Sequence, residues 1–198
     1  MEQPSLDPRT TALVLIDLQR GIVARPVAPH SAAQVLERAG RLASRCREVG
    51  STVVLVRVAY GSDGRDRLAP RVDAASWGGP APADFSEIVA EIGPREGDIV
   101  ITKRQWGAFY GTELELQLRR RRIGTLILGG IATNFGVEST ARDAYERGYE
   151  QVFVEDAMAA LTAEAHHFAV TTIFPRIGLV RSTEDVLNAL AGTRAAGS

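Results

Sequence analysis

Three features of the sequence stand where side chains and backbone could carry out chemistry together. Asp17 closes the apolar run ALVLID, and Lys103 follows the run DIVIT. Gly136 lies in the segment GGIATNFGVEST, which follows the run TLIL. In open parallel α/β sheets, ligands bind at the carboxyl ends of the strands, so polar groups just after such runs are the first candidates. The sequence therefore predicts a site shared by three separate segments.

The chemistry expected of the first two residues is proton transfer. A carboxylate at the end of a buried strand loses hydration, which raises its pKa and suits it to general acid or base catalysis. Lys103 could be the cation that offsets this effect. In the alternative interpretation, Asp17 caps the turn from Leu18 to Gly21 and Lys103 is a partly solvated charge. The two residues alone leave both interpretations open.

The third segment predicts a strand that turns sharply into a helix. The first N–H groups of such a helix have no intrahelical partners and lie at the positive end of its dipole, so they can receive an oxyanion or a carboxylate. Gly136 would let the backbone approach a ligand. Alternatively, the glycines serve close packing, and Thr133 or Asn134 is a simple helix cap.

The elements that must position these groups alternate along the chain. Apolar runs rich in β-branched residues predict strands at Thr11–Asp17, Ser51–Val58, Asp98–Thr102, Thr125–Gly129, Gln151–Glu155 and, more weakly, Arg176–Val180. Amphipathic stretches predict helices at Ser31–Val49, Thr112–Arg121, Val137–Arg147, Ala163–Ile173 and Thr183–Ala191. Because most strands are apolar throughout, both faces of the sheet should be covered. The predicted fold is a three-layer, doubly wound α/β domain with a Rossmann-like parallel sheet of about six strands.

Composition narrows the class of protein. The chain has 198 residues, of which 45% are hydrophobic and 24% charged, as in soluble globular domains. A formal net charge of -1 gives no global attraction to nucleic acid or to an anionic membrane. The start of the sequence has no apolar signal region, and the single cysteine, Cys46, cannot form an intramolecular disulfide. These observations predict a cytoplasmic protein.

One domain is expected for residues 1–198, with residues 1–9 and 192–198 frayed. Residues 61–85 are rich in Gly, Pro, Asp and Arg and predict a long loop. A loop of this length is usually functional, as a lid or a subunit contact, and its Trp77 needs cover.

From about Thr11 to about Leu190, the sequence resembles the isochorismatase-like hydrolases. The stretch TALVLIDLQRGI resembles the family's first strand with its catalytic aspartate, and KRQWGAFYGTELELQLRRRRI resembles its catalytic-lysine segment. The stretch GGIATNFGVESTARDAYERGYEQVFVEDAMAA resembles its nucleophile segment. The three segments occur in the family's order.

The resemblance implies a role for each matched residue. Asp17 would be the catalytic acid or base, Lys103 its charged partner, and the N–H groups of Ala132 and Gly136 an oxyanion hole. Ile131-Ala132 would be a non-proline cis peptide. Most relatives carry a nucleophilic cysteine where this chain has Gly136, so a cysteine-based amidase mechanism is excluded. Cys46 lies in a predicted helix near the opposite edge of the sheet and should pack as a small apolar group.

The same resemblance bears on metals and substrates. Some relatives bind a metal after the second strand, but here that region, VAYGSDGRD, has no histidine. His30, His166 and His167 show no ligand spacing in the sequence, so we predict no metal and no cofactor. Isochorismatases also have glycine at the nucleophile position and hydrolyse a vinyl ether by proton transfer from the aspartate. An isochorismate-type vinyl ether is therefore one candidate substrate.

Aromatic and basic residues near the predicted site could contact the substrate. Trp106, Phe109 and Tyr110 could wall a pocket for a flat or cyclic molecule. Arg57 and Arg104 could bind a carboxylate, and Tyr60 is a further candidate for substrate binding. Aromatic residues at this spacing are also common in cores, and such arginines often form surface pairs. The run RRRR at 119–122 ends a predicted helix and indicates a solvated helix end.

The leading hypothesis is a metal-independent hydrolase that acts on a small anionic metabolite through Asp17 and Lys103. The alternative is a noncatalytic protein that binds a metabolite or assembles as an oligomer and keeps both residues as a structural ion pair. The resemblance also predicts a homo-oligomer, without its subunit number.

Overall fold

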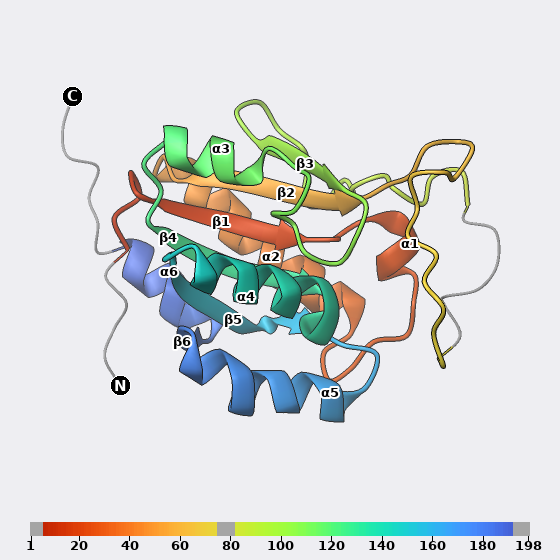
Figure 1. Cartoon of the computed structure of the whole chain (residues 1–198). Helices are drawn as coiled ribbons and strands as arrows, with labels where there is room; N and C mark the ends of the chain where they lie inside the picture. The colour runs from red at the N-terminus through yellow and green to blue at the C-terminus, as the bar shows by residue number, and fades with distance from the viewer. Residues whose placement is uncertain (1–5, 75–81, 192–198) are drawn as a thin grey trace.

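The computed structural model describes residues 6–74 and 82–191, which contain one sheet of six parallel strands (Figure 1). The strands lie in the order β3-β2-β1-β4-β5-β6. Their bounds are β1 Thr11–Ile16, β2 Thr52–Val58, β3 Ile99–Lys103, β4 Thr125–Ile131, β5 Glu150–Ala159 and β6 Leu179–Arg181. The predicted doubly wound parallel sheet is confirmed.

The strand order fixes where a ligand site can lie. From β1 the chain winds outward through β2 to β3, and then returns to add β4, β5 and β6 on the other side of β1. The direction of winding therefore changes between β1 and β4. In doubly wound folds, the crevice at this switch point is the usual ligand site.

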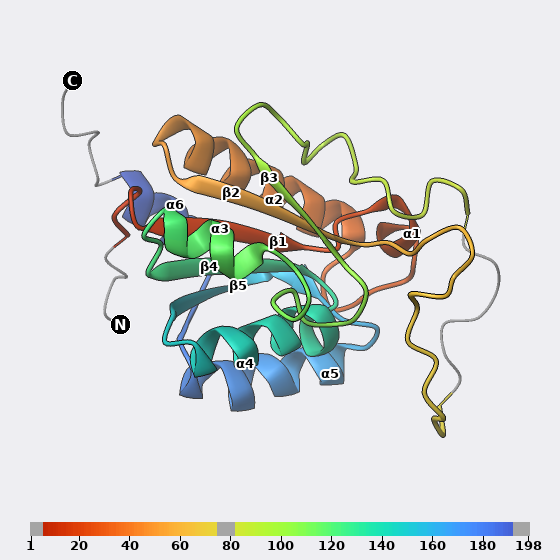
Figure 2. The same ribbon diagram turned by 45° about the horizontal axis from the view of Figure 1, so that its top comes forward.

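Helices cover both faces of the sheet, as Figures 1 and 2 show. One face carries α2 (Ala32–Glu48) and α6 (Thr183–Ala191). The other carries α3 (Leu114–Arg120), α4 (Glu138–Glu146) and α5 (Ala163–Phe168). All six residues of β1 are buried. Burial on both faces explains why its sequence is apolar throughout instead of alternating.

Two regions differ from the predicted elements. The helix expected over Ala163–Ile173 is α5 followed by a π-helical turn at Ala169–Ile173 and a 3₁₀ turn at Phe174–Arg176. The turn expected at Leu18–Gly21 contains the short helix α1 (Arg20–Val23). After α5 the chain stays helical, but its hydrogen-bond spacing changes in a way that an apolar pattern does not reveal.

Strand β5 is longer than predicted and is interrupted by a bulge. Leu128 of β4 pairs with Phe153 of β5, and Gly130 of β4 pairs with Met158 of β5. Between these two pairs the chain advances two residues on β4 but five on β5. The three extra residues on β5 leave the regular ladder, and this irregular part contains Glu155 and Asp156. A bulge of this kind re-aims side chains that would otherwise alternate between the faces of the sheet.

The ends and the long loop can be compared with the sequence only in part. Leu6 is buried in the core beneath α2 and α6, so the prediction of a frayed segment over 1–9 is wrong at this residue. Residues 61–74 contain no strand or helix and are mostly exposed, as the loop prediction required. Trp77 and residues 192–198 lie outside the described residues. Among the described residues, no helix has the length and apolar character needed to cross a membrane.

Gly130 of β4 illustrates how tightly the switch point is packed. Its φ is 122°, and a Cβ atom at this position would overlap the carbonyl oxygen of Ile16 in β1. We expect Gly130→Ala to lower the free energy of unfolding by about 2–5 kcal/mol, because backbone strain and overpacking add. Gly148→Ala is the matched control, since Gly148 has a φ of 76° and no atom within 4 Å of the added Cβ. Urea unfolding should show the larger loss at Gly130, and equal losses would contradict the packing argument.

Candidate functional site

Asp17 and Lys103 meet at the carboxyl ends of the strands. Asp17 follows β1 with a φ of 54°, and its N–H donates to the carbonyl of Val56 in β2 at 2.8 Å. Lys103 ends β3, beyond β2, and its side chain reaches back so that Nζ lies 2.7 Å from Asp17 Oδ2. Asp17 is 6% exposed and Lys103 2%. The interpretation of Lys103 as a partly solvated charge is therefore wrong.

The surroundings of this ion pair leave one carboxylate oxygen unused. Lys103 Nζ also donates to the Trp106 carbonyl at 2.7 Å, so two acceptors hold the ammonium in place. Asp17 Oδ1 is buried and has no hydrogen-bond partner among the described residues. A buried polar atom without a partner is costly, and a catalytic role or a bound water molecule or ion can explain its presence. Oδ1 is thus the oxygen best placed to carry or accept a proton.

Burial dominates the electrostatics of this carboxyl. It raises the pKa of Asp17 from 3.8 to about 6, while the charge and the hydrogen bond of Lys103 act in the opposite direction. A pKa near 6 leaves about a tenth of the molecules protonated at pH 7. The same group can therefore act as an acid and, after losing its proton, as a base.

Gly136 faces the ion pair from the segment after β4. A Cβ atom at this position would stand 3.1 Å from Asp17 Oδ2 and 3.3 Å from Lys103 Nζ. The backbone is held there by the π-helical turn Thr133–Val137, and Thr140 Oγ1 donates to the Gly136 carbonyl at 2.7 Å. The structure thus brings the three segments predicted from the sequence to one point.

The strand-to-helix turn has the predicted backbone. The peptide bond between Ile131 and Ala132 is cis, as predicted, and Ala132 is in an extended conformation before the turn begins. Ala132 and Gly136 are both buried. Their role as an oxyanion hole stays a prediction.

Comparison with known proteins identifies the family. The family model described as the isochorismatase domain matches residues 11–185. The chain belongs to this family. It is similar to the isochorismatase family protein YecD of Escherichia coli O157:H7, with 51% identity over 93% of this chain and 98% of YecD. The family protein YwoC of Bacillus subtilis is 49% identical over 94% of this chain and 97% of YwoC.

Solved structures agree with the family assignment. An isochorismatase family protein from Burkholderia thailandensis superposes with a TM-score of 0.91 and 43% sequence identity. The match covers 96% of this chain and 100% of that chain. The two folds therefore agree over almost the whole length of both proteins, including the sheet that carries Asp17 and Lys103.

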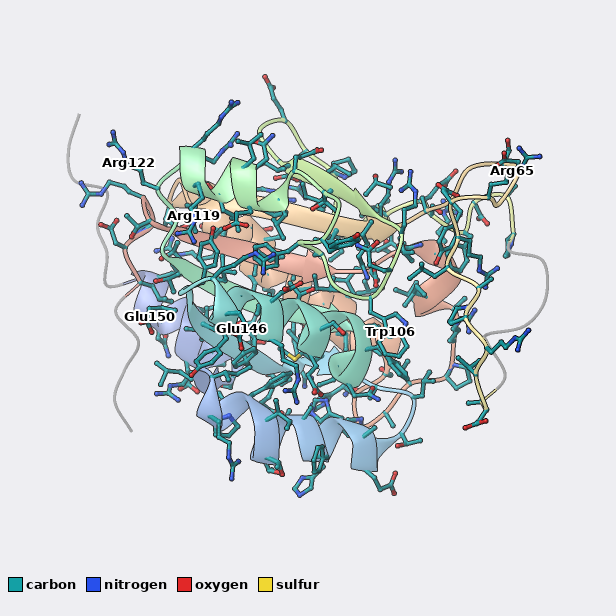
Figure 3. All side chains as sticks on the ribbon, in the orientation of Figure 1. Arg65, Trp106, Arg119, Arg122, Glu146 and Glu150 are labelled. Atoms are coloured by element: carbon teal, nitrogen blue, oxygen red, sulfur yellow. The ribbon has the colours of Figure 1, made fainter. Side chains whose placement is uncertain are left out.

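Two of the predicted substrate contacts lie near the ion pair. Trp106 is 62% exposed, and its ring packs against Phe135 with the centroids 4.8 Å apart. Figure 3 places Trp106 near the carboxyl ends of the strands, on the side to which the arrows of β1 and β2 point in Figure 1. Arg119 and Arg122 lie at the opposite end. Burial raises the pKa of Tyr60, and the charge of Asp17 adds to this effect, so Tyr60 lies within electrostatic reach of the carboxylate. In this isochorismatase-family protein, both side chains remain candidates for binding the substrate.

Phe109 is placed differently from the prediction, whereas the prediction for Arg57 is not contradicted. Phe109 is 4% exposed, belongs to the core beneath α3 and α4, and lies beside the Tyr149 ring. It is a packing residue, because its buried neighbours leave no face for a substrate. Arg57 Nε donates to Thr102 Oγ1 on the neighbouring strand β3, and its contact with a substrate stays a prediction.

Gln19 is a residue of the site that sequence reasoning missed. Its fully buried side chain accepts from the Val58 N–H at 2.8 Å and donates to the carbonyls of Val58 and Phe85. It therefore fastens the segment after Asp17 to the end of β2 and to the end of the long loop. The sequence did show an amide side chain two residues after Asp17. It was missed because this position falls in the stretch Leu18–Gly21, for which the sequence predicts a turn.

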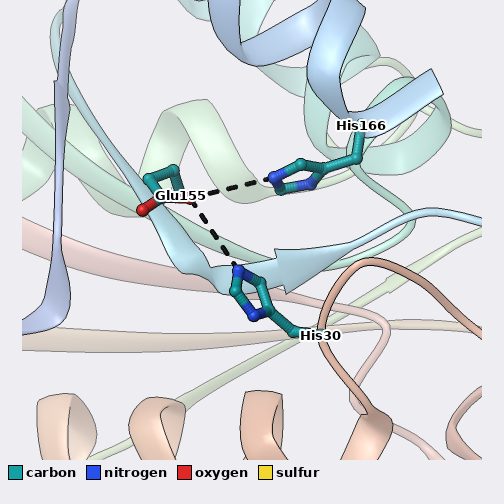
Figure 4. A group of neighbouring side chains, drawn as sticks. All are labelled: His30, Glu155 and His166. Carbon is teal, nitrogen blue, oxygen red and sulfur yellow. Dashed lines mark ion pairs between the residues drawn. The ribbon is translucent and has the colours of Figure 1, made fainter. Parts of the chain in front are cut away.

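Two of the three histidines lie close together, although their spacing in the sequence did not indicate it. His30 and His166 both lie beside Glu155, as Figure 4 shows. His167 is exposed and is not part of this group. Cys46, by contrast, is buried in α2 as predicted, and burial raises the pKa of its thiol to about 12.

Proposed function

We propose that this isochorismatase-family protein hydrolyses a small anionic vinyl ether by general acid catalysis from Asp17, without a covalent intermediate. The observation that carries the proposal is the buried, unpaired Oδ1 of Asp17, in a carboxylate that faces Gly136, the residue that the resemblance matches to the family's nucleophile. Gly136 has no side chain that could attack a carbonyl. A positioned acid is sufficient for a vinyl ether, because its β-carbon is basic enough to take a proton.

The proposed reaction uses Asp17 twice. The proton on Oδ1 is transferred to the terminal vinyl carbon, and the carbon that bears the ether oxygen becomes an oxocarbenium centre. Water attacks this centre and gives its proton to the carboxylate of Asp17. The resulting hemiketal collapses to a carbonyl compound and an alcohol, whose oxygen takes up a proton as the C–O bond breaks.

Lys103 and the turn after β4 support these steps. The ammonium of Lys103 occupies Oδ2, so that Oδ1 is left to carry the proton. The N–H groups at the start of the turn Thr133–Val137 would favour a carboxylate on the substrate, as those at a helix N-terminus do. The exposed ring of Trp106 offers an apolar wall on the solvent side.

A substrate panel tests the proposal. We expect the protein to convert carboxylated vinyl ethers, including isochorismate, to a carbonyl compound and an alcohol, and to leave matched amides and carbamates unchanged. The reaction should be slower in D₂O, because a proton moves to carbon in the difficult step. Turnover of amides alone would contradict the acid mechanism. A metabolite that raises the melting temperature without being converted would instead support the noncatalytic hypothesis.

A further inference from the structure

A second cluster of ligating side chains lies away from Asp17. His30 comes from the segment before α2, Glu155 from the bulged part of β5, and His166 from α5 (Figure 4). The Nε2 atoms of His30 and His166 lie 3.8 Å and 3.9 Å from the same oxygen, Oε2 of Glu155. Three segments that are distant in the sequence therefore turn their donor atoms toward one point.

The spacing of these atoms suits an ion better than direct hydrogen bonds. Distances of 3.8 Å and 3.9 Å exceed the usual 2.7–3.2 Å of an N–H···O bond. One donor atom from each residue can be chosen so that all three lie within 4.8 Å of one another. Ligands at ~2.0–2.1 Å from a tetrahedral zinc ion stand about 3.3 Å apart, so a small inward movement of each side chain would complete the geometry.

A neighbouring residue already orients one of the imidazoles. His166 Nδ1 lies 2.9 Å from Thr133 Oγ1, and both side chains are buried. A hydrogen bond at Nδ1 leaves Nε2 as the nitrogen that faces Glu155. Ligating histidines characteristically have such a partner on the second nitrogen, which fixes the ring and its tautomer.

The charges around the cluster also permit a cation. Among the described residues, the arginine that acts on His30 electrostatically is Arg38. Its guanidinium is neutralised by Asp156, with Nη1 donating to the Asp156 carbonyl at 2.7 Å and Nε lying 3.6 Å from Oδ2. Glu155 and Glu164 add negative charge around a hollow of about 540 Å³ that the cluster lines.

We propose that His30, Glu155 and His166 bind a divalent transition-metal ion of the zinc type, with a fourth position open to this hollow. Two imidazoles and a carboxylate are a ligand set that zinc accepts, and three protein ligands leave room for water or a small anion. The sequence argument against a metal considered only residues after the second strand and the spacing of histidines along the chain. The bulge in β5 is what brings Glu155 between two histidines that lie on different elements.

Zinc binding to the full, untagged and metal-stripped chain tests the proposal. Calorimetry with Zn²⁺ should give one ion per chain, and Co²⁺ should give the intense visible absorption of a tetrahedral site. Glu155→Gln and His30→Gln should each weaken binding by at least ~100-fold, since each removes a ligand, whereas loss of an outer partner typically costs 10–100-fold. His167→Gln is the matched control, because His167 lines the same hollow but lies outside the cluster.

Each outcome decides the proposal. Binding that survives Glu155→Gln and His30→Gln, or that is lost in His167→Gln, would place the ion elsewhere and overturn it. The absence of Zn²⁺ binding at a tenfold excess over protein would overturn the proposal and show that the three side chains form only a cluster of charges. Melting curves of the metal-free variants separate lost affinity from lost folding. Thr133→Val, which removes only the partner of His166, should give an intermediate loss of affinity.

Discussion

Replacing Asp17 with asparagine is expected to lower kcat/KM by about 10²–10⁴-fold, the range typical of a lost general acid. Asparagine keeps the shape of the side chain, and its oxygen can still accept from the Lys103 ammonium at the position of Oδ2. It cannot give a proton to carbon, and it cannot take one from water. Steady-state kinetics with a substrate found in the vinyl ether panel would measure the loss, and the melting temperature would check the fold.

The pH dependence of the wild-type protein links this loss to the protonated form of Asp17. Because burial raises the pKa of Asp17 to about 6, the acid form predominates below pH 6 and disappears above it. The value of kcat/KM should therefore fall as the pH rises through about 6, by about tenfold for each further pH unit.

Lys103→Met serves as the companion variant. It removes the cation that opposes the effect of burial, so the pKa of Asp17 should rise further. The fall of kcat/KM with pH should therefore begin at a pH that is higher by ~1 pH unit or more. A residual activity of Asp17→Asn near that of the wild type would remove Asp17 from the mechanism. A pH dependence of kcat/KM that is unchanged in Lys103→Met would also contradict a role for Asp17.

The fold and the ion pair could be predicted because both depend on local patterns. A strand buried on both faces is apolar along its whole length, so the first charged residue after β1, Asp17, marks the strand end. Lys103 is the first charged residue of the apolar, partly buried strand β3 and is its last residue. Parallel strands bring their carboxyl ends to the same edge. The sequence pattern alone did not give the strand order, and the pairing of Lys103 with Asp17 was implied by the family resemblance.

What could not be predicted depends on packing between distant segments. Phe109 and Trp106 are close in the sequence and both aromatic, yet one lies in the core and the other at the surface, because only the position of α4 decides which ring is covered. Glu155 lies in a bulge of β5 that leaves no mark in the apolar pattern, so its approach to His30 and His166 could not be predicted. Gln19 was missed for a similar reason, since its partners lie on β2 and on the long loop.

The second large effect is expected from Gly136→Cys, which places a thiol beside the ion pair. The added Cβ would lie 3.1 Å from Asp17 Oδ2, which can accept the thiol proton, and 3.3 Å from Lys103 Nζ, which would stabilise the thiolate. The N-terminal turn of a helix adds a positive field. The thiol should therefore have a pKa well below 8.5, the usual value for cysteine. We expect it to react with iodoacetamide at pH 7 at least about tenfold faster than an ordinary surface thiol.

The wild-type chain offers a clean background for this measurement. Cys46 is the single cysteine in the sequence and is buried, and its pKa of about 12 keeps it protonated, so it should not be labelled in the folded protein. Glu146→Cys, at an exposed position of α4, supplies the ordinary surface thiol for comparison. The new side chain meets Ile16 Cγ2 at 2.8 Å, so the melting temperature should fall slightly as Ile16 shifts.

A slow thiol at position 136 in a folded variant would mean that the ion pair does not act on this position. The residue-by-residue match to the family's nucleophile would then fail. A fast thiol that becomes slow when Asp17→Asn is added would show the opposite, since Asp17 would then be the group that takes the proton. In that case the site at Gly136 retains the acid–base arrangement of a cysteine hydrolase. The absence of a thiol would then be what restricts the protein to substrates that need a proton and water but no covalent attack.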